Sequence, residues 1–455
     1  MKNKLLYMGC AALLTSTSIY AQTSNKELLQ RIKKLENDQK ERSKLTIGGD
    51  YRFSIDNLNY KMANNATHDN PMLYTNRVWL TVGYKQDKHL SFNAKLAYNK
   101  AFGQVNLKNQ AQFDNYDWFS SKTNTSNQLL LKEAFIDYKG SKLFGQSIPW
   151  DVGVGRRPTS YNKLISLRDD EAASSPLGHI VSAEFDGGHL GFNLAQQTGI
   201  SGFRIKLAAG RGLSNIEPSV FSTPNAKSGK NINMFALNLV TYANKNLHTE
   251  LQVLRATNLV DITSAGYDQF GAFNPANYDG TLNRVGNINL ASYMAMYTLK
   301  DFNNAKVFAS LALSQTDPKS GETMLGSAHS KVGSSIWIGT QFKSLLSEGG
   351  KWGVEYNYGS KYFRSFTYTE DTAVGSKVAA RGNAFEAYFT EPIYKGLSAQ
   401  LRLTYIDYNY SGSNGFFGSQ TGTPMNIGNI PNSTDIAANV VDTAQNVRLY
   451  LRYKF

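Results

Sequence analysis

The residues best suited to chemistry gather in one stretch, "GRRPTSYNKLISLRDDE", at positions 155–171. It contains two adjacent arginines and then a base followed by three acids: Arg156, Arg157, Arg168, Asp169, Asp170 and Glu171. Opposite charges this close together can neutralise one another in a salt-bridge network. They can also line a narrow passage and sort solutes by charge. Which of these roles applies depends on the elements that position them.

Catalytic and metal-binding patterns do not occur in the sequence. There is no HExxH, GxSxG, GxxxxGK[ST] or CxxC motif, and the six histidines have no ligand spacing. The chain has a single cysteine, Cys10. We therefore expect no enzymatic activity, no cofactor and no metal site. A hydrolase whose site is built from distant strands would leave no motif, so an enzyme remains a third alternative without support from any residue.

The first 21 residues have the pattern of a secretory signal peptide. Two lysines precede a short apolar core, and small residues lead to a cleavage site after Ala21. Cleavage there would remove Cys10 and leave a mature chain without a thiol. A glycine before Cys10 leaves a lipid anchor as an alternative. After this segment no apolar run approaches the roughly 20 residues of a membrane-spanning helix.

Residues 22–43 predict a short periplasmic helix and linker. Leu28, Ile32 and Leu35 follow a heptad spacing, and charged residues fill most other positions. About two heptads are too few for a stable coiled coil alone. The segment is either a solvated linker or a coil that helps the protein to trimerise or to contact the cell wall.

From residue 44 to 455 the apolar residues recur at every second position. In "DVGVGRR", Val152 and Val154 share one face, and Arg157 lies on the other. Tyrosine, phenylalanine and glycine are frequent, and proline is scarce. This composition favours strands and turns.

The connections between these strands alternate in length. Tight turns are expected at 186–188, 242–246, 300–304 and 394–396, and long polar loops near 103–127, 213–231, 256–286, 316–331, 361–383 and 411–443. Short turns on one side and long loops on the other are typical of outer-membrane barrels. We predict an all-β fold, a transmembrane antiparallel barrel of about 16–18 strands, preceded by the short coiled-coil-like helix.

The chain ends on "NVRLYLRYKF", which alternates between an apolar face and a charged face. Tyr453 and Phe455 are expected to face lipid, and Arg448 and Arg452 the lumen. A terminal amphipathic strand that ends in phenylalanine resembles the signal by which outer-membrane barrels are recognised for assembly. We therefore assign Tyr453 and Phe455 to that signal.

The formal charge of +13 comes from 48 basic and 35 acidic residues. A nucleic-acid partner is not expected, because the chain is exported and has no basic helix or recognised binding motif. Basic side chains are costly against lipid and should collect in the lumen and at the rims. Such a lumen would favour anions.

Several motifs resemble a family of outer-membrane barrels from epsilon-type proteobacteria that is described only as a domain of unknown function. They are "GRRP", "LRDD", "SPLGHI" and "EFDG" in this order, together with "SIDNLNYK", "NRVWL", "AYNKAFG" and "GRGLSN". The resemblance implies the barrel fold and the outer membrane, and no activity. In architecture alone the chain is also similar to trimeric porins with a basic lumen.

These observations predict a porin-like channel for passive diffusion of small hydrophilic solutes, with mild anion preference. The alternative is a structural or adhesive barrel without a transport role. The stretch at 155–171 is then either a loop that enters the lumen and narrows it, or a network that only fixes the loop. Expected partners are the lipid bilayer, lipopolysaccharide, the barrel-assembly machinery and small solutes. A homotrimer is one alternative for the oligomeric state.

Overall fold

The computed structural model describes residues 30–34, 44–102, 129–157, 159, 162–169, 171, 173, 176–183, 185–213, 231–262, 282–367, 370, 372–413, 417 and 422–455. The chain divides into two compact units, Met1–Thr46 and Ile47–Phe455. In the first unit, residues 30–34 are helical and exposed. The rest of the predicted helix and the predicted signal peptide lie outside the described residues, so both stay predictions. Within the described residues, no helix has the length and apolar character needed to cross a membrane.

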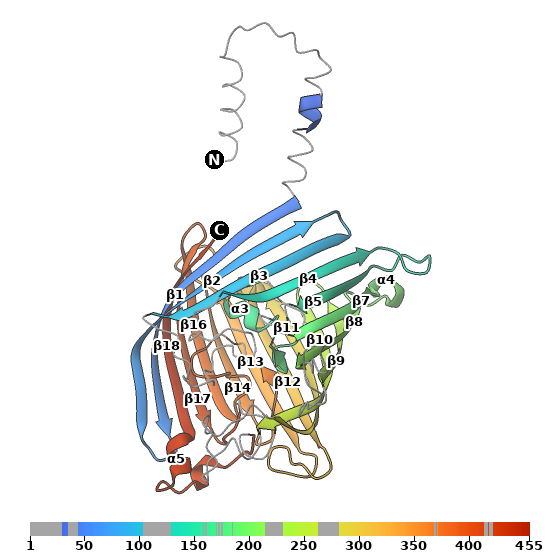
Figure 1. Cartoon of the computed structure of the whole chain (residues 1–455). Coiled ribbons are helices and arrows are strands. Elements are labelled where there is room, and N and C mark those ends of the chain that lie inside the picture. The colour runs from blue at the N-terminus through green and yellow to red at the C-terminus, as the bar shows by residue number, and fades with distance from the viewer. Residues whose placement is uncertain are drawn as a thin grey trace, which may run out of the picture. The chain divides into compact units, whose positions relative to one another are not determined.

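The second unit is a closed barrel of 16 antiparallel strands (Figure 1). This confirms the all-β barrel and the lower end of the predicted strand number. The barrel strands are β1 (Leu45–Met62), β2 (Thr67–Lys85), β3 (Leu90–Ala101), β4 (Leu130–Gly140), β5 (Trp150–Arg157), β7 (Phe185–Asn193), β8 (Arg204–Leu213), β9 (Ile232–Ala243), β10 (Leu247–Ile262), β11 (Leu282–Leu299), β12 (Ala305–Pro318), β13 (Val332–Lys343), β14 (Lys351–Gly359), β16 (Gly382–Tyr394), β17 (Leu397–Tyr408) and β18 (Val441–Lys454).

The last strand closes the barrel against the first. Tyr51 of β1 lies opposite Tyr453 of β18, and the pairing runs on to Met62 with one irregularity at its end. The backbone of Phe455 exchanges hydrogen bonds with Gly49 at 2.9 and 3.0 Å. Closure leaves no unpaired strand edge, which is the requirement for a sheet that spans a bilayer.

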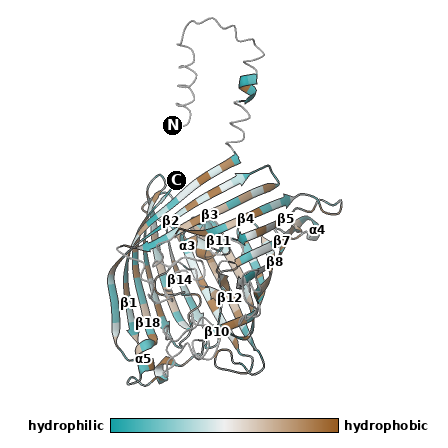
Figure 2. Cartoon of the chain, viewed as in Figure 1, coloured by the Kyte–Doolittle hydropathy of each residue, from teal (hydrophilic) through white to brown (hydrophobic). Residues whose placement is uncertain are grey.

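Hydrophilic and hydrophobic residues follow one another along the strands (Figure 2), and the burial of side chains alternates in the same way, as the sequence pattern predicts. On β18, Leu449 and Leu451 are exposed on the outside, whereas Arg448, Tyr450 and Arg452 are buried on the inside. Exposed aromatic residues gather at both ends of the outer face. Those near the short turns are Tyr138, Tyr242, Tyr297, Trp352, Tyr394 and Tyr453, and those near the long loops are Phe235, Tyr358, Phe385 and Tyr405. Two aromatic belts around an apolar band are the outer surface of a membrane barrel.

Apart from the four-residue β1–β2 connection at 63–66, the long connections lie at one end of the barrel and the short turns at the other. The seven short turns run from 86–89 to 395–396, and the C-terminus lies at their end, while the β17–β18 connection with α5 (Asp435–Asn439) and η3 (Ile427–Asn429) lies at the other (Figure 1). Three of the predicted turns occur, near 242–246, 300–304 (where η2, Lys300–Phe302, lies) and 394–396.

The turn predicted at 186–188 is wrong, because these residues lie inside β7. Glycine is required there for packing and not for a turn. A Cβ at Gly187 would lie 2.1 Å from the carbonyl oxygen of Ala209 on the next strand. The actual turn between β7 and β8 is 194–203, which contains α4 (Ala195–Thr198).

Two long loops contribute structure to the interior. The β5–β7 loop carries α3 (Ile165–Asp169) and β6 (Val181–Ser182), and the β14–β16 loop carries β15 (Phe366–Thr367). β6 and β15 pair in parallel, apart from the barrel sheet. The two loops therefore form one inner layer.

Candidate functional site

The β5–β7 loop crosses the lumen and packs against the opposite wall. The Nδ1 atom of His179 lies 2.9 Å from Oγ of Ser310 on β12, and its Nε2 lies 2.8 Å from Oγ of Ser335 on β13. His179 also packs edge-on against Trp337 and Phe363. Burial lowers the pKa of His179 to about 3, so the imidazole is neutral at ordinary pH. A neutral ring can donate to one hydroxyl and accept from the other.

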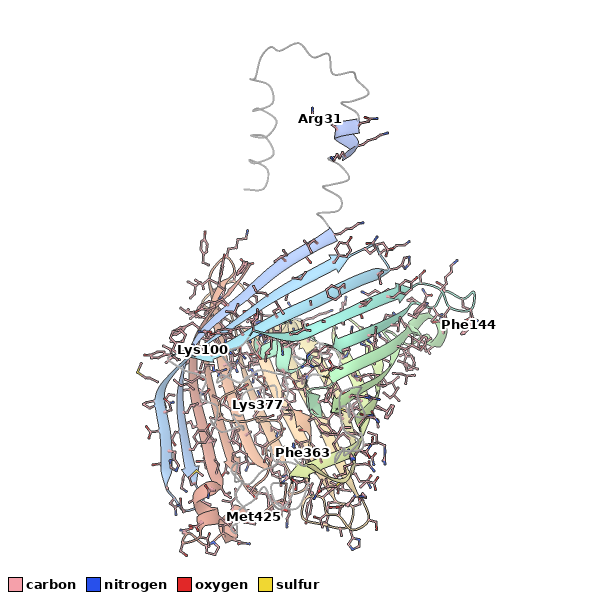
Figure 3. All side chains as sticks on the ribbon, in the orientation of Figure 1. Arg31, Lys100, Phe144, Phe363, Lys377 and Met425 are labelled. Atoms are coloured by element: carbon pink, nitrogen blue, oxygen red, sulfur yellow. The ribbon has the colours of Figure 1, made fainter. Side chains whose placement is uncertain are left out.

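Apolar contacts add to this packing. One buried cluster joins Ile180 and Val181 of the loop to Leu254 and Leu290 of the wall and to Phe363 of the β14–β16 loop. A second cluster joins Leu164, Ile165 and Leu177 of the loop to Trp337 and Met294 of the wall. These contacts bury the inner face of the wall beside β10–β13 (Phe363 is labelled in Figure 3).

Arg168 of α3 anchors the loop to the wall through charge. Its Nη1 donates to both carboxylate oxygens of Glu386 on β16, at 2.9 and 3.1 Å, and its Nε and Nη2 donate to Asp169 at 3.1 and 3.0 Å. Burial opposes its charge, but the carboxylates of Asp169 and Glu386 more than offset this and raise the pKa of Arg168 above the ordinary arginine value. The side chain is fully buried and ionised, so the anchor depends on these partners.

The acids of the loop face basic residues of the last two strands. Asp169 accepts a hydrogen bond of 2.6 Å from Nη2 of Arg402 on β17. Arg452 on β18 forms ion pairs with Glu171 and with Asp50 of β1, and it donates to the backbone oxygen of Asp169. The loop thus carries acids to a basic wall, the arrangement in which a lumen loop would narrow a pore.

Further charges surround this anchor. Lys377 of the β14–β16 loop lies 2.7 Å from Glu355 of β14 and also pairs with Glu386. Glu370 accepts a hydrogen bond of 2.5 Å from Ser376, and burial raises its pKa despite Lys377 and Arg168 nearby. The β14–β16 loop and the β5–β7 loop therefore share one charged interior with the wall.

The structure separates the two adjacent arginines at the end of β5. Arg157 faces the lumen, where its Nη1 donates to Oδ1 of Asp137 at 2.8 Å. Arg156 has the parity of Val152 and Val154, both exposed, and its Nη1 pairs with Asp186 of β7 at 3.2 Å. Arg156 therefore lies on the outer face near the long-loop end, away from Arg157. Asp170 lies outside the described residues.

One side of the lumen stays accessible. Along β3–β8 several inward charged side chains retain partial exposure, 19% for Lys95, 16% for Arg157 and 39% for Arg204, although Lys132 and Glu133 of β4 are buried. Across the barrel, Glu386 and Arg448 are fully buried. The inner layer therefore fills the lumen unevenly and leaves a polar strip along β3–β8.

Sequence reasoning missed the wall partners of the loop. Glu355, Glu386 and Arg402 are charged residues at inward positions in the middle of strands with apolar outer faces. That parity was the available signal. Which loop residue each would meet depends on pairing across the barrel, which the sequence pattern does not contain. Among the described residues, no group of three or more His, Cys, Asp or Glu side chains is placed to hold a metal ion.

A family model described as "Protein of unknown function (DUF3373)" matches residues 67–455, which include 15 complete barrel strands and the inner loops. The chain belongs to this family. The match confirms the resemblance seen in the sequence motifs, apart from the type of bacterium. A comparison with curated proteins finds no match.

Several solved structures are similar to this member of the DUF3373 family. An anion-selective porin from Comamonas acidovorans has 10% identity and a TM-score of 0.49, over 90% of this chain and 99% of that chain. OprB from Pseudomonas putida has 11% identity and a TM-score of 0.49, over 92% and 96%. OmpT of Vibrio cholerae, an outer membrane protein in a trimer form, has 11% identity and a TM-score of 0.47, over 90% and 99%.

The barrel itself fixes the location of this DUF3373 protein. It is closed, its outer band is apolar, and aromatic belts mark both ends of that band. Strands cross a bilayer only in closed barrels, and barrels of this kind occupy the outer membrane. The chain is a porin-like barrel of the cell outer membrane.

Proposed function

We propose that the protein is a channel for passive diffusion of small hydrophilic solutes. The observation that carries this proposal is the uneven filling of the lumen. A barrel of 16 strands is wide enough for an aqueous channel. The inner layer buries the wall on the β10–β18 side, and inward charged residues of β3, β5 and β8, namely Lys95, Arg157 and Arg204, stay partly accessible.

We propose only a mild anion preference. On the inner face of β3–β8, five bases, namely Lys95, Lys132, Arg157, Arg204 and Lys206, stand against three acids, namely Glu133, Asp137 and Asp151. The surplus is two positive charges, and the Lys163–Glu250 pair next to this side leaves it unchanged. Most of the formal charge of +13 therefore lies elsewhere on the chain. Five of the seven short turns carry a lysine: Lys88, Lys142, Lys245, Lys300 and Lys395.

Planar-bilayer recording tests the channel directly. Purified, folded protein should produce discrete conductance steps, and a salt gradient should give a reversal potential displaced toward the anion. The displacement should shrink at high salt, since screening shortens the reach of each charge. Folded protein that never conducts would contradict the channel.

The alternative is a structural or adhesive barrel. The observation in its favour is the extent of the inner layer, whose charges and apolar clusters are buried as in a solid core. A deletion strain distinguishes the two functions. Lost surface attachment with unchanged solute uptake would favour the structural role, and the reverse would favour the channel.

The other segments and partners predicted from the sequence are also part of this proposal. We propose a signal peptide at 1–21, a periplasmic helix and linker at 22–43, and contact with lipopolysaccharide around the loop end. Tyr453 and Phe455, whose exposed rings stack at 5.6 Å, would be read by the barrel-assembly machinery. A homotrimer would be tested by chemical cross-linking of the chain with and without residues 22–43.

A further inference from the structure

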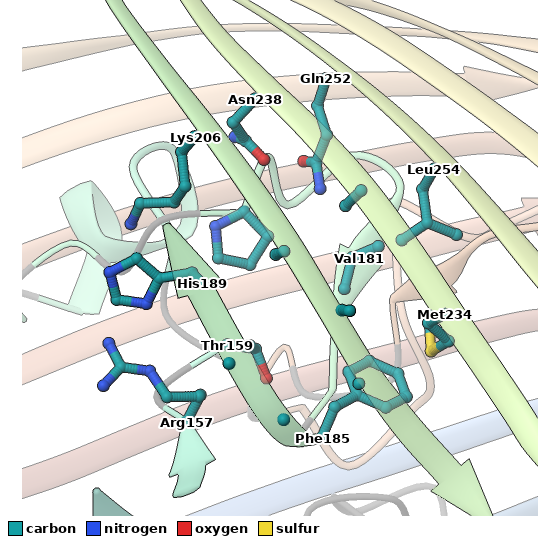
Figure 4. A pocket seen from close by; sticks show the side chains of 17 residues that line it. Arg157, Thr159, Val181, Phe185, His189, Lys206, Met234, Asn238, Gln252 and Leu254 are labelled. Carbon is teal, nitrogen blue, oxygen red and sulfur yellow. The ribbon is translucent and has the colours of Figure 1, made fainter. Parts of the chain in front are cut away.

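A cavity lies between the β5–β7 loop and the wall of β7–β10 (Figure 4). The empty space between its lining residues amounts to about 680 Å³, part of which is open solvent. Arg157 of β5 also reaches it, so the cavity borders the accessible side of the lumen. Neither the charged anchor nor the channel proposal accounts for its shape.

Strand register arranges the lining from an apolar end to a polar end. In one row Gly187, Gly210 and Met234 lie side by side on β7, β8 and β9. Two residues further along each strand, His189, Ala208 and Ala236 form the next row. In the third row Lys206 lies beside Asn238, which pairs with Gln252 of β10. The cavity is thus graded in polarity along the strands.

The polar end has a positive surplus. Three bases lie here, Arg157, Arg204 and Lys206, against the two carboxylates of Asp137 and Asp151. Asp151 is engaged by Arg204 and, at 2.7 Å, by Nε2 of His189. Adding Lys163 and Glu250, which pair at 3.4 Å, leaves the surplus at one charge. A single anionic group would balance this end.

The apolar end can bury a body of carbon atoms. Val181 of the β5–β7 loop faces Phe185, Met234 and Leu254 of the wall across the cavity (Figure 4). All four are buried residues of one hydrophobic cluster. An apolar group that binds here removes its surface from water, which favours binding.

Small residues on the wall provide the space. The middle of the cavity is floored by Ala208 and Ala236, which lie opposite each other, and by glycines at 187 and 210. At Gly187 no side chain would fit, since its Cβ would clash with the backbone of β8. Larger side chains at the two alanines would fill the cavity.

We propose that this cavity binds a small organic anion with an apolar body, such as an aromatic or branched aliphatic carboxylate. The carboxylate would lie by Lys206 and Arg157, and the apolar body would lie between Phe185 and Met234. The inference rests on the proposed channel in so far as the ligand would be a solute that uses the lumen. It adds a substrate class to that channel.

Calorimetry with the mature chain in lipid nanodiscs tests the site. The probes are benzoate, benzamide, which lacks the charge, and acetate, which lacks the apolar body. Benzoate should bind at least about tenfold more tightly than either of the other two, because only benzoate satisfies both ends. A wild-type protein that does not bind benzoate, or that binds all three alike, would overturn the proposal.

Variants locate the binding in this cavity. Lys206→Gln should weaken benzoate binding about tenfold, and Ala208→Phe should abolish it by filling the space. Lys245→Gln, in the exposed β9–β10 turn, is the charge-matched control and should bind as the wild type does. Each variant is first shown to be folded by its heat-modifiable migration on gels. Wild-type affinity in both folded cavity variants would overturn the site.

Conductance recording on the same preparations separates this inference from the channel. Benzoate binding without any conductance would contradict the channel and leave the site standing. Conductance without benzoate binding would contradict the site alone.

Discussion

The neighbours Arg156 and Arg157 show how one step along a strand changes the role of a charge. They have the same side chain, but Arg157 pairs with Asp137 inside the barrel and Arg156 pairs with Asp186 outside it. A charge on the outer face at the rim is screened by solvent, whereas one in a confined lumen acts on every passing ion. Arg156 is therefore a matched control for the effect of Arg157 on ion selectivity.

Arg157→Gln is expected to shift the reversal potential toward cations, because it removes one of the surplus positive charges of the accessible strip. Arg156→Gln should leave the reversal potential unchanged. Both are measured in planar bilayers under the same low-salt gradient. Equal shifts in the two variants would show that the rim, and not the lumen, sets selectivity.

His179 makes the packing of the β5–β7 loop sensitive to acid. Its pKa is about 3 in the folded protein against an ordinary value of 6.5, so between these values the unfolded state binds more protons. Stability contributed by the neutral ring is complete above pH 6.5 and is lost as the pH falls towards 3. Ser310, Ser335, Trp337 and Phe363 around it offer no negative charge to an imidazolium.

Hydrogen exchange measured at pH 4.5 and 7.5 checks this expectation. The amides of residues 177–183 should lose protection at the lower pH in the wild type. In His179→Gln the difference between the two pH values should be much smaller. The same acid sensitivity in both proteins would assign it to other groups, such as the buried carboxylates.

Among the elements, the barrel strands were predictable and the inner layer was not. Period-two alternation in segments such as Leu397–Tyr408 predicted both the strand and its faces, because lipid and lumen impose opposite polarity. The pattern does not specify where a loop goes after it leaves a strand. The charges at 168–171 indicated a loop that enters the lumen. Their partners on the wall, Glu386 and Arg402, follow more than 200 positions later in the sequence.

Arg168→Met should release the β5–β7 loop from the wall. Removing one member of a buried ion pair costs about 3–5 kcal/mol, since Glu386 keeps a buried charge with fewer partners. We expect a lower temperature of heat modification and a larger single-channel conductance. Arg255→Met is the matched control, because the Arg255–Asp317 pair is about half exposed and contributes roughly 0–1 kcal/mol. Unchanged conductance in a folded Arg168→Met protein would mean that the loop does not restrict the lumen.

The molecule as a whole has two chemically distinct ends. Lysines mark the short turns, and the long polar connections lie at the other end. In outer-membrane barrels short turns face the periplasm and long loops face the exterior. The orientation of every site described above depends on this assignment.

Single cysteines at the two ends of β12 test the orientation. If the signal peptide is removed with Cys10, the mature chain has no other thiol to label. Ser320→Cys in the β12–β13 loop should react with a membrane-impermeant maleimide on intact cells, and Asp301→Cys in the β11–β12 turn should react only after lysis. The opposite pattern would invert the topology.

Arg452 links barrel closure to the docking of the β5–β7 loop. On the last strand it holds Asp50 of the first strand and, at the same time, Glu171 and the backbone of Asp169 in the β5–β7 loop. Before β18 pairs with β1, the Arg452–Asp50 ion pair is absent. The acids of the loop then lack a complete set of positively charged partners. An insertion intermediate with an open barrel would therefore lack this part of the loop anchor, while the contacts of His179 and Arg168 with the wall do not depend on closure. A factor that recognises the completed pairing of β18 with β1 would therefore also recognise a barrel in which Arg452 holds the β5–β7 loop.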